Sequence, residues 1–266
     1  KEIKKIEKAF LLASQAHQGQ LRKTGEDYIV HPLSAASLLA DFQLDHEAIM
    51  AAILHDVIED TSLEKGYLQK TFGVKVSELV DGVSKLDKIN FSTNEEADAA
   101  NLRKMILAMS QDIRVILIKL ADRKHNLETI GALTSLQKRK IGKETLEIFA
   151  PIALRLGIHS LNIELEDLAF EAIYPLRYKI IKNEIKKSSG NRTELMGKIG
   201  KVLSQKLKNE SLSSDVIARE KHVHGIYKKM KQREIKFSEI NDIFGVRVIC
   251  SSTDDCYRSL GVIHNL

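Results

Sequence analysis

The chain of 266 residues is long enough for one large core or two modest domains. Its composition is 43% apolar and only 5% aromatic, with no Trp, which favours helices packed through Ala, Leu and Ile over a β-sandwich. Two cysteines, Cys250 and Cys256, exclude a disulfide framework and a cysteine-based metal knuckle. We see no signal peptide, and no apolar run approaches the roughly 18 residues of a membrane span. We therefore expect a cytoplasmic protein.

Charge is distributed unevenly along the chain. Residues 1–175 hold 22 Lys and Arg against 26 Asp and Glu, whereas residues 176–266 hold 19 against 10. The basic last third favours an anionic ligand such as a nucleotide or RNA. A solvated basic face would have the same composition, so charge alone does not separate these two interpretations.

Apolar residues recur with helical spacing through most of the first 174 residues. Asp45 is a candidate N-cap for one helix that continues through Asp60. Residues 87–99 lack periodicity, which predicts an exposed loop. Further helices are predicted to begin near Ile6 and after Pro32, and over residues 112–126, 145–157 and 164–173.

The character of the sequence changes near Tyr174-Pro175. A basic helix is predicted over residues 177–187, and Ser188-Ser189-Gly190-Asn191 then predicts a turn or linker. A helix over 193–209, a strand over 215–219, a helix over 223–232 and a strand over 244–250 are expected to follow. The predicted fold class is mainly α. An all-helical domain over 1–175 precedes connecting helices and the opening of an α/β domain over 176–266.

The segment AIMAAILHDVIED, residues 48–60, combines an apolar helical face with ionisable side chains. Helical spacing from Ile49 puts Asp56 on the apolar stripe. A carboxylate in that position is costly unless it is paired, hydrogen-bonded or bound to a metal. His55 is its neighbour, and Glu59 and Asp60 are expected to project from the next turn. By itself the pair His55-Asp56 is weak evidence for a site, because a His-Asp pair at the protein surface would have the same sequence.

Two other segments strengthen the prediction of a metal site. Asp122 follows the apolar face of the helix predicted over 112–126, and His31 stands at a helix entrance before Pro32. Each of them alone could have an ordinary structural role. Together with His55 and Asp56 they supply two imidazoles and two carboxylates, a nitrogen and oxygen set that suits Mn²⁺, Fe²⁺ or Zn²⁺ with open positions for water and substrate.

The order of these residues resembles the HD phosphohydrolase superfamily, and the surrounding motifs resemble the RelA/SpoT homologues, which make and degrade the guanosine alarmones ppGpp and pppGpp. The similarity extends over essentially the whole chain. The motifs that carry it are RKTGEDYIVHP (22–32), ILHDVIEDT (53–61), DGVSKLDK (81–88), ILIKLADRKHN (116–126), APIALRLGI (150–158), REKHVHGIYKKM (219–230) and INDIFGVRVI (240–249).

This resemblance implies Mn²⁺-dependent removal of pyrophosphate from the 3′ position of the alarmone, which leaves GDP or GTP. The residues that match the family's metal ligands are His31, His55, Asp56 and Asp122. Glu59 and Asp60 match an acidic pair that handles the protons of water and leaving oxygen. Arg22 and Lys23 match residues near the guanine and phosphates, and Tyr28, Lys85, Asn126 and Thr129 are expected to line the pocket. Lys124 and Glu128 depart from the family's usual residues, which puts phosphate contacts in doubt but affects no ligand.

The basic last third resembles the start of the family's synthetase domain. Arg219, Lys221 and Lys229 match its ATP-phosphate-binding residues, and Asp242 matches its first Mg²⁺ ligand. A basic helix and a capping Asp would explain the same residues without the family. The second carboxylate and the guanine-binding loop are expected beyond Leu266, so synthesis, with its Mg²⁺, is not expected of these residues alone. Regulatory partners are expected to act through other regions.

Three other functions stay open from the sequence. One is an HD hydrolase of another nucleotide, such as a deoxynucleoside triphosphatase or nucleotidase, which a comparison of ppGpp with dGTP would identify. Another is a non-catalytic alarmone-binding regulator, which would bind ppGpp without releasing pyrophosphate. The third is an RNA- or ribosome-associated adaptor, whose binding would be salt-sensitive and independent of the metal site.

Overall fold

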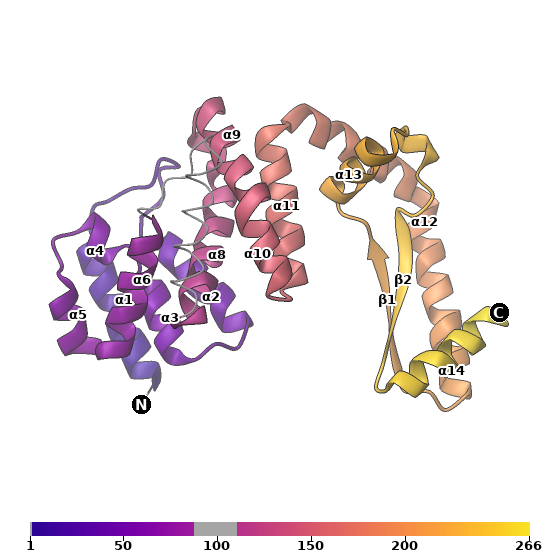
Figure 1. Ribbon diagram of the computed structural model, residues 1–266, viewed down its shortest axis with the longest axis horizontal. Coiled ribbons are helices and arrows are strands. Elements are labelled where there is room, and N and C mark those ends of the chain that lie inside the picture. Colours follow the sequence, from indigo (N-terminus) through magenta and orange to yellow (C-terminus); the bar gives the residue numbers. More distant parts are fainter. Residues whose placement is uncertain (1, 88–110) are drawn as a thin grey trace. The chain divides into compact units, whose positions relative to one another are not determined.

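A computed structural model describes residues 2–87 and 111–266 (Figure 1). The chain divides into two compact units, residues 1–173 and 174–266. Except for Asp87, the loop predicted over residues 87–99 lies outside the described residues. Among the described residues, no helix combines the length and the apolar character that crossing a bilayer requires.

The regular elements of the first unit are helices, apart from an isolated bridge between Leu21 and Asp27, in the part of the chain that the structure describes. In chain order they are α1 (Glu2–Ala16), α2 (Val30–Asp41), α3 (His46–Ile53), α4 (Val57–Asp60), α5 (Lys65–Phe72), α6 (Val74–Asp87), α8 (Ile113–Glu128), α9 (Ser135–Glu144), α10 (Ala150–Arg155) and α11 (His159–Ile173). A 3₁₀ turn (Ile130–Ala132) follows α8, and a π-helical turn (Thr145–Phe149) joins α9 to α10.

The core of this unit lies where α2, α3, α6 and α8 pack together. Alanines with no exposed surface, such as Ala35 and Ala51, let the helix backbones approach closely. Leu39, Val80 and Ile116 fill the space between them and are also fully buried. The close packing fixes the positions of α2, α3 and α8 relative to one another, and these are the helices around which the site is built.

Side-chain caps begin two of these helices. Asp45 accepts a hydrogen bond of 2.8 Å from the backbone N–H of Ala48 at the start of α3, which confirms the predicted N-cap. Asp112 caps α8 in the same way through the N–H of Arg114 at 2.9 Å.

The single helix predicted from Asp45 through Asp60 is wrong. α3 ends at Ile53, a turn occupies residues 54–56, and α4 begins at Val57. Apolar periodicity continues through the turn, so spacing alone did not show the break. In the structure the backbone N–H of Val57 bonds to the carbonyl of Leu54 at 3.1 Å, which closes a tight turn in place of the regular ladder.

The second unit begins with one long helix, α12 (Pro175–Asn209). The turn predicted at residues 188–191 is therefore wrong, because the helix continues through it. Ser, Gly and Asn cost up to about 1 kcal/mol each in a helix relative to Ala, which tertiary packing can offset. Ile181, Ile185 and Leu207 are buried on either side of the segment and anchor the helix.

A two-stranded antiparallel ribbon packs against α12. β1 (Ser214–Glu220) and β2 (Phe244–Cys250) pair from Ser214 opposite Cys250 to Glu220 opposite Phe244. α13 (Val223–Arg233) and a 3₁₀ turn (Phe237–Glu239) connect the strands, and α14 (Thr253–His264) follows them. Both predicted strands and the helix between them are present. The predicted fold class, mainly α with an α/β opening in the last third, is confirmed.

Candidate metal centre

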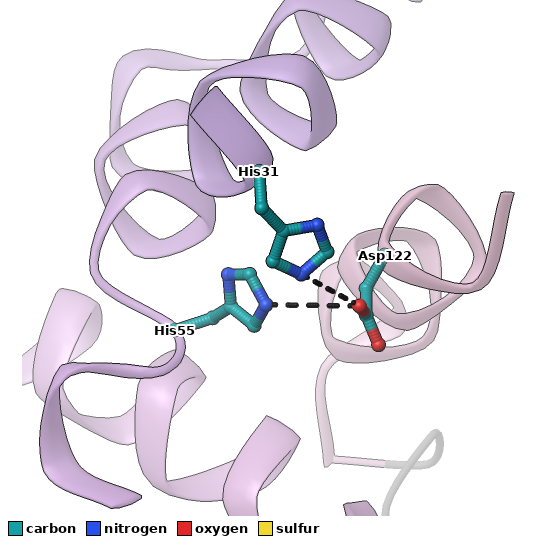
Figure 2. Close-up of side chains that lie close together, drawn as sticks. All are labelled: His31, His55 and Asp122. Carbon is teal, nitrogen blue, oxygen red and sulfur yellow. Dashed lines mark ion pairs between the residues drawn. The ribbon is translucent and has the colours of Figure 1, made fainter. Parts of the chain in front are cut away.

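Three segments far apart in the sequence bring their polar side chains together in the first unit (Figure 2). His31 comes from the first turn of α2, His55 and Asp56 from the turn between α3 and α4, and Asp122 from the middle of α8. Nε2 of His31 lies 3.0 Å from Oδ1 of Asp122 and 3.5 Å from Oδ2 of Asp56. Nε2 of His55 lies 3.1 Å from Oδ1 of Asp56 and 3.9 Å from Oδ1 of Asp122. All four predicted ligand residues therefore lie close together, with His31, His55 and Asp122 forming the tightest group.

The turn at residues 54–56 is what allows consecutive residues to face the same point. Successive side chains of a regular helix diverge by about 100° around its axis. In this turn His55 is buried, with 2% of its surface exposed, while Asp56 is half-buried. Helical spacing did not show that His55 is the more deeply buried of the two, because the turn interrupts the helix here while Leu54 and Val57 on either side of the pair stay fully buried.

The donor atoms fit a divalent metal ion. A ligand atom each from His31, His55 and Asp122 lies within 4.8 Å of the others, and all three residues are buried. Nδ1 of His55 donates to the carbonyl of Ala52 at 2.7 Å, which leaves Nε2 of the neutral ring without a proton. That buried Nε2 makes no hydrogen bond with any described residue. An orphaned imidazole nitrogen beside two carboxylates is the environment expected of a ligand atom.

Buried charges around Asp122 hold it ionised. Burial alone would raise its pKa, but the Lys119 ammonium outweighs this effect and holds that pKa well below its usual range. Lys119 donates to Oδ2 at 2.5 Å, and Nδ2 of Asn126 donates to Oδ1 at 2.5 Å. Burial lowers the pKa of His55, but the charges of Asp56 and Asp122 outweigh it and raise that pKa. The negative charges of Asp56 and Asp122 therefore have the largest electrostatic effect on His55 after its burial.

A cavity of about 450 Å³ opens beside this cluster. Four basic residues contribute to its wall: Arg22, Lys23, Lys119 and Arg123. Arg22 is held in place because its Nη2 donates to Oδ1 of Asn126 at 2.7 Å and to Oγ1 of Thr129 at 3.4 Å. A guanidinium with a fixed orientation and nearby cations suit the oxygens of a phosphate group.

The two residues of the acidic pair, Glu59 and Asp60, lie in different environments. Glu59 lines the cavity, whereas the Oδ2 atom of Asp60 accepts a 2.6 Å hydrogen bond from the hydroxyl of Tyr28. The same hydroxyl lies 2.9 Å from Oδ2 of Asp56. Burial and the charge of Asp56 raise the pKa of Tyr28 far above its usual value, so the hydroxyl keeps its proton. Tyr28 thus joins Asp60 to a candidate ligand, and it also lines the cavity as predicted.

Comparison with known proteins identifies the first unit. The HD domain family matches residues 9–159, which include His31, the His55-Asp56 pair and Asp122. The chain belongs to the HD domain family. A second match, to the region found in RelA / SpoT proteins, covers residues 218–266.

The relatives of this HD domain protein are much longer than the chain. It is 51% identical over 265 residues to the bifunctional (p)ppGpp synthase/hydrolase SpoT of Escherichia coli (strain K12), covering 100% of this chain and 38% of that protein. It is also 51% identical to the guanosine-3′,5′-bis(diphosphate) 3′-pyrophosphohydrolase of Haemophilus influenzae, covering 96% of the chain and 38% of the relative. It is 43% identical to the GTP pyrophosphokinase of Myxococcus xanthus, covering 98% of this chain and 35% of that protein. The resemblance to the RelA/SpoT homologues is confirmed.

The structure adds two residues of the HD domain that the sequence analysis missed. Lys119, on α8, is buried against Asp122, and His125, one turn later, places its Nδ1 2.8 Å from Nδ1 of His31. Burial, His31 and Arg22 lower the pKa of His125 to about 4. Lys119 stands three residues before Asp122 and His125 three residues after it, so both lie on the same face of the helix as Asp122. This spacing is the feature of the sequence that could have indicated them.

Lys85 is the predicted pocket residue that the structure places elsewhere. Its Nζ pairs with Oδ2 of Asp81 at 2.9 Å, four residues earlier on α6. Both line a different cavity, of about 350 Å³, together with Arg114. Lys85 is not part of the wall beside His31 and Asp122.

In the second unit, Lys221 and Lys229 both contact Asp242. Lys221 donates to its Oδ2 at 3.2 Å, and Lys229 donates to its Oδ1. The hydrogen bonds from Lys229 and then Lys221 lower the pKa of Asp242 to about 2. Arg219 is exposed on β1. The structure therefore brings together three of the four residues that resemble a synthetase site.

Proposed function

We propose that this HD domain hydrolyses the 3′-diphosphate of ppGpp and pppGpp and releases pyrophosphate with GDP or GTP. The composition of one cavity carries the proposal, because it combines three of the four candidate ligands (His31, Asp56 and Asp122) with Glu59 and four basic side chains. The names of the relatives in Escherichia coli and Haemophilus influenzae support this choice of substrate.

We propose Mn²⁺ as the ion, with His31, His55, Asp56 and Asp122 as the residues that would hold it. The mixed nitrogen and oxygen donors and the orphaned Nε2 of His55 support a divalent ion at this point. When bound, such an ion supplies Lewis acidity toward water and phosphate oxygens.

The chain's own residues account for binding and proton transfer in this proposal. Arg22, Lys23 and Arg123 bind the diphosphate oxygens, and their charges offset the negative charge that develops during the reaction. Glu59 accepts a proton from water as the water oxygen bonds to the phosphorus attached to O3′. The bond between that phosphorus and O3′ breaks, pyrophosphate is released, and O3′ takes up the proton that Glu59 accepted from water. Asp60 orients Tyr28, which in turn holds Asp56.

The direct test is pyrophosphate release from ppGpp by the purified chain with Mn²⁺. We expect turnover by the wild type and a loss of at least about 100-fold in Asp122→Asn, together with weakened Mn²⁺ binding. Full activity of Asp122→Asn would refute the assignment of this centre. Preferential turnover of dGTP would favour another nucleotide hydrolase, and ppGpp binding without turnover would favour a regulator.

The same preparation should be assayed with ATP and GDP for alarmone synthesis. The name of the Myxococcus xanthus relative and the match over residues 218–266 make this the second activity to measure. In this structure Asp242 is bound by Lys221 and Lys229. We propose hydrolysis as the activity of the first unit, whatever this second assay shows.

A further inference from the structure

His31 and His125 are joined by a buried contact between like atoms. Their Nδ1 atoms lie 2.8 Å apart, and the side chains are 2% and 8% exposed. The ring centroids are 4.9 Å apart with an angle of 40° between the planes. A hydrogen bond between two imidazole nitrogens needs a proton on one and a lone pair on the other, so only one of the two tautomer arrangements can hold at a time.

The second nitrogen of the His31 ring decides which of the two tautomer arrangements is compatible with the metal centre. Its Nε2 lies 3.0 Å from Oδ1 of Asp122, in the group of candidate ligand atoms. A nitrogen that binds a metal carries no proton, and a neutral imidazole has one proton to place. The proton of His31 must then be on Nδ1, which makes Nδ1 of His125 the acceptor.

His55 shows the same arrangement with a different partner. Its Nδ1 donates to the backbone carbonyl of Ala52 at 2.7 Å, and its Nε2 faces the centre. A carbonyl is always an acceptor, whereas His125 is an acceptor only when its own proton is on Nε2. The orientation and tautomer of His31 therefore depend on a side chain, and those of His55 on the backbone.

We propose that His125 is a positioning residue that accepts a hydrogen bond from Nδ1 of His31 and so prepares His31 Nε2 to bind the metal. His125 is not part of the cavity wall beside the ligands, so a direct contact with substrate does not explain it. It stands one turn after Asp122 on α8, so that one helix supplies a candidate ligand and the support for another ligand on α2. This inference rests on the proposed metal site and goes beyond it.

The test compares the Mn²⁺ affinity of His125→Leu and His125→Asn by calorimetry, with the wild type and His46→Asn as controls. Leu fills similar space without an acceptor, whereas Asn offers its Oδ1 near the position of Nδ1. Loss of a supporting hydrogen bond of this kind typically weakens metal binding by about 10–100-fold. We expect that loss in the Leu variant, recovery of about tenfold in the Asn variant, and no change in His46→Asn. His46 lies at the start of α3, outside the cavity.

A measurement on the wild type makes the test independent of how well the variants fold. Long-range ¹H–¹⁵N spectra of the protein loaded with diamagnetic Zn²⁺ should show the proton of His31 on Nδ1 and that of His125 on Nε2. A proton on Nδ1 of His125, or wild-type Mn²⁺ affinity in a folded Leu variant, would overturn the proposal. If the wild type binds neither Mn²⁺ nor Zn²⁺, the metal site itself fails and the role of His125 fails with it. If the wild type binds and only the His125 results disagree, the proposed hydrolase function stands.

Discussion

Lys119 donates a 2.5 Å hydrogen bond to Oδ2 of Asp122, and both side chains are almost fully buried. Each charge compensates the other, because an isolated ammonium or carboxylate at this depth would lose its hydration without replacement. The pairing leaves Oδ1 of Asp122 directed at His31 and Asn126. Oδ2 of Asp122 thus stabilises the fold through its pair with Lys119, whereas Oδ1 faces the candidate metal centre.

The first prediction concerns this ion pair. Lys119→Met should lower the free energy of unfolding of the metal-free protein by about 3–5 kcal/mol, because it leaves a buried carboxylate without its partner. Urea titration in EDTA measures the effect. In the control Lys143→Met, whose pair with Glu147 is more than half exposed on both sides, we expect a change below about 0.5 kcal/mol. Equal changes in the two variants would contradict the assignment.

The second prediction separates the two members of the acidic pair. Glu59→Gln should lower kcat for pyrophosphate release by about 100–10,000-fold with little effect on Mn²⁺ affinity, because Glu59 lines the cavity and is proposed to accept the proton. Asp60→Asn should cost about tenfold, and Tyr28→Phe should match it, because Asp60 acts through the Tyr28 hydroxyl. A larger loss in Asp60→Asn than in Glu59→Gln would reverse the two roles.

The third prediction is a pH dependence at Arg114, which pairs with Asp112 at 2.6 Å, Asp45 at 2.7 Å and Glu47 at 3.2 Å. Hydrogen bonds from Arg114 lower the pKa of Asp112. At Asp45, burial is outweighed by the N–H of Ala48 and by Arg114, and the pKa is also lowered. A carboxyl whose pKa is lower in the folded state stabilises the fold above its unfolded pKa near 4, and this stability is lost as the pH falls through the folded value.

Arg114→Met should therefore lower the free energy of unfolding by about 1–2 kcal/mol at pH 7, since solvent partly screens these pairs. The difference from the wild type should shrink as the pH falls from 4 toward about 2, where the carboxylates are protonated in both states. Denaturant titrations at several pH values measure it. Arg139→Met, at an exposed position of α9, is the matched control and should show no such dependence.

The fourth prediction concerns the packing of α9 against α11. A Cβ atom at Gly142 would lie 2.7 Å from Cγ1 of Ile173 and 2.9 Å from the carbonyl oxygen of Ala169. Gly142→Ala should therefore destabilise the first unit by about 1–3 kcal/mol in thermal unfolding. Gly66→Ala, in α5 with open space around it, should instead stabilise by about 0.5–1 kcal/mol. A stabilising Gly142→Ala would show that the two helices separate easily.

The grouping of His31, His55, Asp56 and Asp122 was expected because two imidazoles and two carboxylates suit a metal ion and because their order resembles the HD superfamily. Lys119 and His125 were harder to find. A single Lys in a helix usually faces solvent, and only the tertiary structure, in which α8 packs against α2, shows that Lys119 is buried. The sequence therefore indicated the candidate ligands, whereas the residues that contact them were found only in the tertiary structure.

The errors have physical reasons of their own. At residues 188–191 weak helix formers predicted a turn, but packing of α12 on both sides keeps the helix continuous. Lys85 was assigned to the pocket by family analogy, but its pairing with Asp81 holds it at another cavity. In the first case the tertiary packing of α12 determined the outcome, and in the second a pair four residues apart on one face of α6 did.

The turn between α3 and α4 has a consequence for protein engineering. A design protocol that rewards regular secondary structure would extend α3 through residues 54–56 and gain backbone hydrogen bonds. His55 and Asp56 would then point in directions about 100° apart, and no choice of side chain at either position would restore their common focus. Stabilisation of this protein should therefore be sought away from this three-residue irregularity, for instance at Gly66, and the turn should be treated as a fixed part of the candidate metal centre.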